Sequence, residues 1–306
     1  MEIGVILMLV ALVATLGSAT AAHVWVADLA VHFRLQWAAF ALAGCLILAA
    51  AGDARWAALA FVVAAIQALL SAPLLHVRAP PPADPAAAAP LRLMAINVWC
   101  RNRQYQRVID CIARERPDVI LLAEVTAKWE QALAPLDASY AHCYATRGAG
   151  RMGLVLLSRW PMQAVILPGF SDVEPAIAAH LIIKDRRVQL LSVHTNWPLG
   201  PAASALRARQ LALIAEFARS RTDPLIVVGD LNVSPFSPHF QALLAAGNLK
   251  SAAQGFGWQP TWPTFLPPAG IQIDHALTSP GVIVTSFRRG AHVGSDHLPT
   301  VIDCLF

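Results

Sequence analysis

Three long apolar stretches separated by short polar breaks open the chain, and only the later part alternates hydrophobic with polar positions. The stretches are Ile3–Ala22, about Leu35–Ala51, and Trp56–Leu75. Crossing a bilayer takes about 20 apolar residues, with a lower limit of about 17, so the first and third are comfortable and the second is marginal. Backbone groups in lipid must be hydrogen-bonded within their own segment. We therefore expect about three transmembrane helices in residues 1–78.

Two alternatives to three spans stay open. The first stretch resembles a signal peptide because Ala19-Thr20-Ala21 is a run of small residues, although Met1-Glu2 offers no basic start. The second stretch is short enough to be a re-entrant or surface helix. An integral, multi-pass membrane protein is expected in either case, followed by a Pro/Ala-rich linker over residues 79–90.

Residues 91–306 alternate between short apolar runs and amphipathic segments, which predicts a mixed α/β domain. Helices are expected at Tyr105–Arg116, Thr126–Leu133 and Ala202–Arg219. Strands are expected at Leu91–Ile96, Val119–Ala123, Gly153–Leu157, Ala179–Ile183, Val188–Val193, Leu225–Val228, Ile273–Leu277, Val282–Thr285 and Thr300–Ile302. Strands come in pairs with helices between only some of them, so a simple Rossmann alternation is excluded. Two packed mixed β-sheets with helices outside fit this order.

Composition separates the same two regions. The chain is 57% hydrophobic and 14% charged, with a mean hydropathy of +0.53, whereas soluble domains are about 25% charged. Residues 91–306 nevertheless hold 15 of the 19 acidic and 20 of the 23 basic residues. A disordered chain, a disulfide scaffold and a fibrous repeat are excluded. A channel or transporter is disfavoured, because the polar residues suited to chemistry all follow the apolar stretches.

Polar residues stand at the ends of the predicted strands. They are Asn97 in INVW, Glu124 in LLAEV, His194 in SVHTNWP, Asp230 and Asn232 in VVGDLN, Asp274 in QIDHALTS, and Asp296 and His297 in GSDHLP. A single Asp or Asn after a strand is more often a turn former than a catalyst. Their accumulation at strand ends is what indicates a site.

This combination of residue types predicts metal-assisted phosphoester hydrolysis. Asn97 and Glu124 offer oxygen ligands, which suit Mg²⁺ or Mn²⁺, and no Cys/His spacing indicates zinc. Asp230 is a candidate for orienting or deprotonating an attacking water, and Asn232 for hydrogen-bonding the phosphoryl group. His194 and His297 are candidates for stabilising the transition state or protonating the leaving oxygen, with Asp274 orienting His297.

The ordered motifs resemble those of the endonuclease/exonuclease/phosphatase superfamily, which has the DNase I-like fold. The resemblance covers residues 91–306 and depends most on GDLN and GSDH. It implies a four-layer α/β sandwich, a divalent metal at Asn97 and Glu124, and hydrolysis by a His–Asp pair. Asp296 is implied to help the metal and Asp230 the water, a division that the sequence leaves open. A membrane-anchored member of bacterial type, in the inner or plasma membrane, is expected.

Other residues receive structural interpretations. Arg207 and Arg209 are expected on opposite, solvated sides of a helix, and His275 on the strand face opposite Asp274. Trp258, Trp262 and Phe265 lie in a Pro/Gly-rich loop that either contacts substrate or membrane or packs internally.

Three functions are compatible with these observations. The favoured one is a membrane-anchored phosphatase or phosphodiesterase whose substrate is a phosphorylated, lipid-linked or membrane-proximal molecule, with the bilayer as a partner. A nuclease is the alternative, disfavoured because the positive charge forms no basic run. A non-catalytic membrane scaffold is the third, and no feature indicates a protein partner. The side of the membrane stays open, because the resemblance favours an extracytoplasmic domain while the arginine count favours the opposite.

Overall fold

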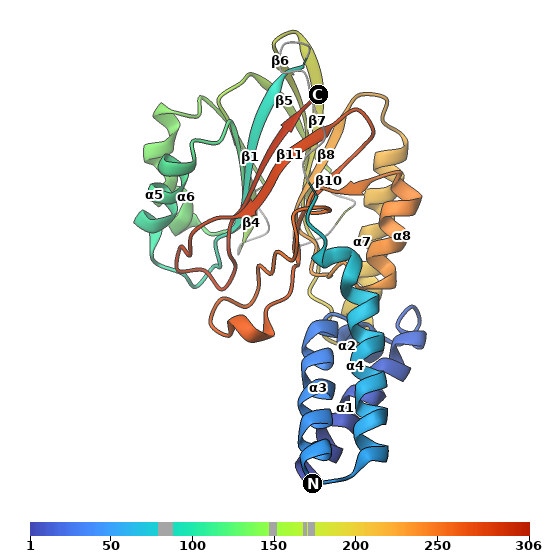
Figure 1. Ribbon diagram of the computed structural model, residues 1–306. Coiled ribbons are helices and arrows are strands. Elements are labelled where there is room, and N and C mark those ends of the chain that lie inside the picture. The colour runs from blue at the N-terminus through green and yellow to red at the C-terminus, as the bar shows by residue number, and fades with distance from the viewer. Residues whose placement is uncertain (79–87, 147–151, 168–169, 171–174) are drawn as a thin grey trace.

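The computed structural model describes residues 1–78, 88–146, 152–167, 170 and 175–306. It shows a bundle of apolar helices attached to one end of a two-sheet sandwich (Figure 1). Nearly all of the predicted linker lies outside the described residues.

Four helices form the N-terminal bundle. They are α1 (Glu2–Gly17), α2 (Trp25–Val31), α3 (Arg34–Ala50) and α4 (Ala54–Leu75), with a 3₁₀ turn at Ser18–Thr20. Among the described residues, Glu2–Thr20 and Ala54–Leu75 are long and apolar enough to cross a membrane, and α2 with α3 adds a third candidate if this pair, bent by 73°, is one span. The polar break before α4 contains the cap of that helix, because Asp53 accepts a hydrogen bond from the Trp56 backbone N–H.

The described strands of the C-terminal region form two six-stranded sheets. The first contains, in spatial order, β11 (Ile283–Arg289), β12 (Thr300–Leu305), β1 (Pro90–Asn97), β2 (Val119–Val125), β4 (Gly153–Ser158) and β3 (His142–Ala145). The second contains β5 (Met162–Leu167), β6 (Ala176–Ile183), β7 (Arg186–His194), β8 (Leu225–Asp230), β10 (Asp274–Thr278) and β9 (Lys250–Ser251). Both sheets are mixed, since β1–β2 and β7–β8 are parallel and their other pairs antiparallel.

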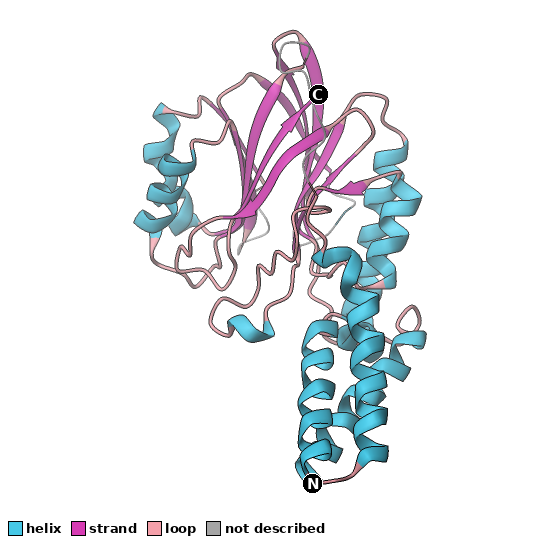
Figure 2. Cartoon of the chain, viewed as in Figure 1, coloured by secondary structure: helices cyan, strands magenta, loops and turns pink. Residues whose placement is uncertain are grey.

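Helices cover both outer faces of the packed sheets (Figure 2). On the first sheet lie α5 (Tyr105–Glu115) and α6 (Ala127–Leu133), and on the second lie α7 (Pro201–Arg219) and α8 (Pro238–Gly247). One apolar core fills the space between the sheets, and two more fill the space between each sheet and its helices. The central strands read as continuous apolar runs because both of their faces are buried. The chain therefore has the predicted four-layer α/β sandwich.

Candidate functional site

The strand register brings the predicted site residues to one end of the sandwich. In the second sheet His194 lies opposite Asp230, and Asp230 lies opposite Asp274. In the first sheet Asn97 ends β1 beside the end of β2, which carries Glu124. Residues from five separate motifs thus meet where two parallel strand pairs end, as ligand sites commonly do in α/β folds.

Gly229 allows the two parallel strands of the second sheet to approach closely next to Asp230. Its φ is +144°, and a Cβ built at this position would lie 1.8 Å from the Val193 carbonyl oxygen. No other residue fits here without moving β7 away from β8. The glycine of the GDLN motif therefore sets the spacing between His194 and Asp230.

Asp230 is the residue that the other site side chains surround. Its Oδ2 accepts a hydrogen bond from Asn97 Nδ2 at 3.1 Å and lies 3.6 Å from His194 Nε2 and 3.7 Å from His297 Nε2. Its Oδ1 accepts a hydrogen bond from the Asn232 backbone N–H at 2.9 Å. One carboxylate oxygen is thus held by the loop, while the other faces both imidazoles.

His297 is oriented by a second carboxylate. Its Nδ1 lies 2.9 Å from Asp274 Oδ2, which leaves Nε2 directed toward Asp230. Ser295 supports this position, because its Oγ accepts from the His297 backbone N–H and donates to the Asn97 carbonyl at 2.7 Å. The GSDH motif therefore ties the second half of the site to the end of β1.

Glu124 leaves its strand in a left-handed conformation. Its φ is +60°, at a register shift between Leu122 and Val125 in the β2–β4 pairing. A bulge of this kind re-aims a side chain. The Glu124 carboxylate accepts hydrogen bonds from Asn97 Nδ2 and from the Cys100 backbone N–H, both at 3.0 Å. Strained residues of this type cluster at functional sites.

Burial and mutual contact shift the pKa values of the central groups. Burial, together with Asp274, raises the pKa of Asp230 to about 6. Burial opposes charging of His297, yet the carboxylates of Asp274 and Asp230 raise its pKa to about 9. Burial also opposes ionisation of Glu124, but His194 and the donors from Cys100 and Asn97 hold its pKa below the ordinary value. At neutral pH the site thus favours a charged His297 beside ionised Asp230 and Glu124.

The donor set fits a hard divalent cation. Asp296 accepts a hydrogen bond from Trp262 Nε1 through Oδ2 at 3.2 Å, whereas its Oδ1 is buried without a hydrogen-bond partner among the described residues. Such an orphaned carboxylate oxygen requires a donor or a cation. Glu124 and the Asn97 amide supply further oxygen atoms, the ligands that Mg²⁺ and Mn²⁺ take.

A second group of potential ligand atoms also lies close together. In the part of the chain that the structure describes, atoms of Asp230, Asp274 and His297 all lie within 4.8 Å of one another, and all three residues are buried. The predicted metal ligands Asn97, Glu124 and Asp296 are distinct from this group. The site therefore offers two candidate ligand sets for a cation, which are linked by the hydrogen bond from Asn97 to Asp230.

The Asn232 side chain hydrogen-bonds a neighbouring loop. Its φ is +47°, and its Nδ2 donates to the Thr195 carbonyl at 2.8 Å. The side chain therefore links the loop after β8 to the loop after β7. Asn232 is held beside Asp230 by this link and by its own backbone N–H.

The prediction that Arg207 is solvated is wrong. Arg207 is completely buried and forms an ion pair with the buried Asp28 of α2, and it donates to the Asn232 carbonyl at 2.8 Å. Periodicity places Arg207 and Arg209 on different helix faces but does not reveal that α2 covers one of them. The sequence analysis therefore missed Asp28, Ser237 and His32. The only sequence feature that points to this group is Asp28 itself, an acidic residue between two apolar stretches.

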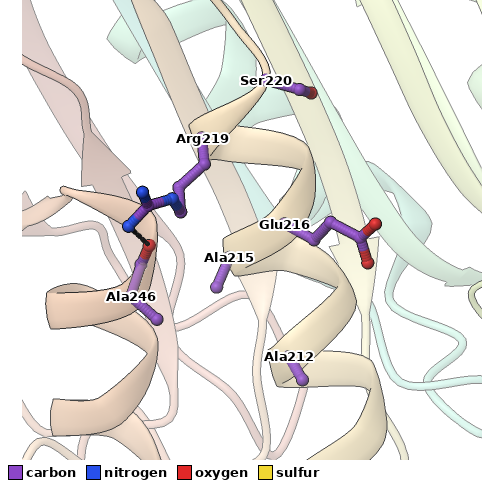
Figure 3. A pocket seen from close by; sticks show the side chains of 6 residues that line it. All are labelled: Ala212, Ala215, Glu216, Arg219, Ser220 and Ala246. Atoms are coloured by element: carbon purple, nitrogen blue, oxygen red, sulfur yellow. Dashed lines mark hydrogen bonds between the residues drawn. The ribbon is translucent and has the colours of Figure 1, made fainter.

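A surface depression on the sandwich lies apart from these residues. Figure 3 shows it between α7 and α8, where Arg219 donates to the Ala246 carbonyl at 3.5 Å. It has a volume of about 470 Å³, and three of its six lining residues are alanines, with Glu216 and Arg219 as its charged members. No predicted site residue contributes to it, so it offers no chemistry comparable to that of the strand ends.

Fold and site together define a metal-dependent phosphoester hydrolase. The chain belongs to the endonuclease/exonuclease/phosphatase family, whose model matches residues 94–297. This match confirms the resemblance that the motifs predicted. Members of this family generally depend on divalent metal ions, and the acidic and histidine groups described above are suited to hold one. No functionally curated protein matches the chain.

Solved structures share the fold at low identity. TDP2 of D. rerio carrying 14 humanising mutations is 17% identical with a TM-score of 0.59, covering 70% of this chain and 98% of its own. A family member from Beutenbergia cavernae is 20% identical with a TM-score of 0.58 and covers 71% of both chains. The human Nocturnin catalytic domain with bound sulfate is 18% identical with a TM-score of 0.57, covering 71% of this chain and 93% of its own. These likenesses confirm the α/β sandwich.

Proposed function

We propose that this protein is a membrane-anchored hydrolase of lipid-linked or membrane-proximal phosphates. The observation that carries this proposal is the placement of the site. The C-terminal ends of β1, β7 and β8 lie at the end of the sandwich that is attached to the apolar helices (Figure 1). These strand ends carry Asn97, His194 and Asp230, and Asp274 is paired with Asp230. An anchor that holds the site at the bilayer raises the effective concentration of substrates in that bilayer.

Contacts on two sides of the site support this placement. His32, between α2 and α3, lies 2.9 Å from Ser234 Oγ, four residues after Asp230. Gln36 in the first turn of α3 donates to the carbonyls of Pro268 and Gly270 at 3.2 and 3.1 Å. These contacts hold the ends of the apolar helices next to loops that also reach the site.

Exposed aromatic side chains on the loop after β7 and on the loop before β10 support a membrane-facing site. Trp197 follows His194 by three residues and is 66% exposed, and Phe265 is 75% exposed. Phe265 adjoins Thr264, which hydrogen-bonds the backbone of Ser295 and Asp296. Aromatic side chains are enriched at membrane–water interfaces. We infer that these two loops contact the headgroup region while the site faces a phosphate there.

The proposed mechanism has two proton transfers, one to a carboxylate and one from an imidazole. Asp230 takes one proton from the water whose oxygen attacks phosphorus, and one of the two imidazoles, His194 or His297, donates a proton to the leaving oxygen. Asp274 holds His297 in the orientation that directs Nε2 into the site. Asn232 keeps the Asp230 loop in place through the hydrogen bond from its Nδ2 to the Thr195 carbonyl, and the remaining N–H of that amide is the proposed donor to the phosphoryl group.

Glu124, Asn97 and Asp296 are the residues we propose to hold the cation, with Mg²⁺ or Mn²⁺ as the ion. When bound, such an ion polarises a phosphoryl oxygen and neutralises developing charge. The bacterial type of the protein and the side of the membrane remain predictions from the sequence. The division into a membrane region (1–78), a linker (79–90) and a catalytic domain (91–306) is part of this proposal.

Hydrolysis by the purified full-length chain in detergent tests the proposal. We expect phosphate release from a polyprenyl pyrophosphate with Mg²⁺ or Mn²⁺, and its loss in EDTA. Asp230→Asn and His297→Ala should each lower the rate by about 10²–10⁴-fold, the usual contribution of acid–base groups. Glu216→Gln, in the depression of Figure 3, is the matched control and should retain the wild-type rate.

Two other outcomes contradict this substrate class. Metal-dependent nicking of supercoiled plasmid, lost in both variants, would assign the protein to the nucleases. One of the similar structures is TDP2 of D. rerio complexed with a single-strand DNA product, so the plasmid arm is a necessary comparison. If the protein hydrolyses neither substrate, the non-catalytic scaffold remains as the alternative. The roles assigned to Asp230 and His297 would then be withdrawn.

A further inference from the structure

A buried polar network connects α2 to the loop between β8 and α8. This loop, residues 231–237, follows Asp230 directly and is called here the β8–α8 loop. Asp28 in α2 is 1% exposed and Arg207 in α7 is 0% exposed, and the two form an ion pair. Ser237 Oγ donates to Asp28 Oδ1 at 2.6 Å. Asp28 of the N-terminal bundle is thus buried against α7 and the β8–α8 loop of the sandwich.

The network reaches the site through the backbone of Asn232. Arg207 uses one guanidinium nitrogen for Asp28 and the other, Nη1, for the Asn232 carbonyl at 2.8 Å. Asn232 in turn donates its backbone N–H to Asp230 Oδ1 at 2.9 Å. The path from the bundle to the proposed base therefore consists of three consecutive polar contacts.

A second contact holds the same loop from the other end of α2. His32 Nδ1 accepts a hydrogen bond from the Ser234 backbone N–H at 3.3 Å and lies 2.9 Å from Ser234 Oγ. Together with Ser237, three of the loop's residues are in contact with residues 28–32 or with the arginine that Asp28 holds. Asn232 has a left-handed backbone with a φ of +47°, a conformation that asparagine tolerates well, and its carbonyl is fixed by Arg207.

We propose that Asp28 and Arg207 are positioning residues and that α2 completes the catalytic unit. Neither touches the reacting atoms. Arg207 fixes the Asn232 carbonyl and thereby the orientation of Asp230, and Asp28 fixes the guanidinium, whose planar fork serves two acceptors at once. The N-terminal bundle is then a component of the active site as well as an anchor. This inference rests on the proposed function because it assigns Asp230 the catalytic role.

The kinetic test separates positioning from folding. Asp28→Asn and Arg207→Gln are made in the full-length chain and assayed in detergent with bis(p-nitrophenyl) phosphate, a soluble probe that needs no membrane. Small displacements of a catalytic group cost up to about 10²-fold, so we expect kcat to fall at least tenfold with KM changed less than threefold. Arg219→Gln, an exposed arginine of the same helix (Figure 3), is the control for Arg207. Asp53→Asn, which preserves a good helix cap, is the control for Asp28.

A second measurement does not depend on activity. Hydrogen exchange of the full-length protein, followed by mass spectrometry well below the unfolding temperature, should quicken in residues 230–237 in both variants and in neither control. Exchange in β1 and β2 should stay at the wild-type rate. This measurement distinguishes failure of the inference from failure of the proposed function, because hydrogen exchange can be compared even if the wild-type protein does not hydrolyse bis(p-nitrophenyl) phosphate.

Two results would overturn the inference. If both variants keep kcat and the exchange of residues 230–237 within twofold of wild type, the network does not position the loop. If exchange quickens equally in every strand, the ion pair serves only the stability of the fold.

Discussion

At the residue scale, the site is characterised by buried ionisable groups that contact one another. Asp230, Asp274 and His297 are each at most 5% exposed, and burying charges is costly unless they are paired and hydrogen-bonded. Here each carboxylate has an imidazole or an N–H donor. The pairing of Asp274 with His297 is the contact whose electrostatic contribution is most directly measurable.

Removal of His297 should change stability in a pH-dependent way in the metal-free protein. Its pKa is raised to about 9 in the folded state, above the value of about 6.5 for an unfolded chain. A raised pKa means that charged His297 stabilises the folded state fully below pH 6.5, and that this contribution is lost as the pH rises through 9. In EDTA, the difference in Tm between wild type and His297→Asn should shrink from pH 7 to pH 10.

His275 supplies the control for this series. Burial lowers its pKa to about 4, so it stays neutral in both folded and unfolded states above pH 7. The Tm difference for His275→Asn should therefore be constant from pH 7 to pH 10. A His297→Asn difference that is equally constant would show that His297 is not charged in the folded protein.

Close helix packing at the element scale determines the shape of the N-terminal bundle. Gly44 of α3 lies against α1 so closely that a Cβ there would be 2.8 Å from the Gly4 carbonyl oxygen. Small residues at helix interfaces permit such approach in membranes. The same bundle is joined internally by a hydrogen bond of 2.9 Å from Gln67 Nε2 to Thr15 Oγ1.

Gly44→Ala should therefore destabilise the bundle, although alanine is the better helix former. The added methyl group forces α1 and α3 apart, and overpacking of this kind costs about 1–3 kcal/mol. Gly17→Ala is the matched control, because nothing lies within 4 Å of a Cβ at that position. Thermal unfolding in detergent should give a lower Tm for Gly44→Ala and an unchanged or higher Tm for Gly17→Ala. The opposite order would show that the helices do not cross at Gly44.

At the scale of the whole molecule, the sandwich is attached to a bundle of apolar helices, and this attachment is relevant to the choice of substrate. The site and the ends of the helices share one side of the sandwich (Figure 1). In the proposed function, this arrangement lets one chain recognise a phosphate group and the surface that presents it. We propose that the exposed Trp197 and Phe265 carry out the second part of that recognition.

Replacing both exposed aromatics should affect only a substrate held in a bilayer. Burying one large apolar side chain is worth about 1.5–3 kcal/mol, so Trp197→Ser with Phe265→Ser should lower kcat/KM at least tenfold for a polyprenyl pyrophosphate in vesicles. Hydrolysis of bis(p-nitrophenyl) phosphate should be unchanged. Ile182→Ser is the control, since Ile182 is 56% exposed but lies opposite Arg187, at the end of β6–β7 away from His194. Equal losses on both substrates would place the two aromatics in the site itself.

Most of the sandwich follows from the sequence because its central strands are buried on both faces. Continuous apolar runs such as Val119–Ala123 and Leu225–Val228 leave few alternatives to a strand. The short or half-exposed elements were missed, among them β3, β5, β9 and α8. Their apolar pattern is weak because only one face packs, so cross-strand partners rather than local periodicity decide them.

The sequence by itself determined the two-part organisation of this protein and the residue types of its site. Hydrophobic periodicity is a local property, and polar residues after buried strands are recognisable one motif at a time. Only the tertiary structure decided which of these residues meet, through the strand register that aligns His194, Asp230 and Asp274. It also decided that Asp28, 179 positions before Arg207 in the chain, belongs beside the site loop. A contact of that separation depends on how the finished layers pack, which no local pattern encodes.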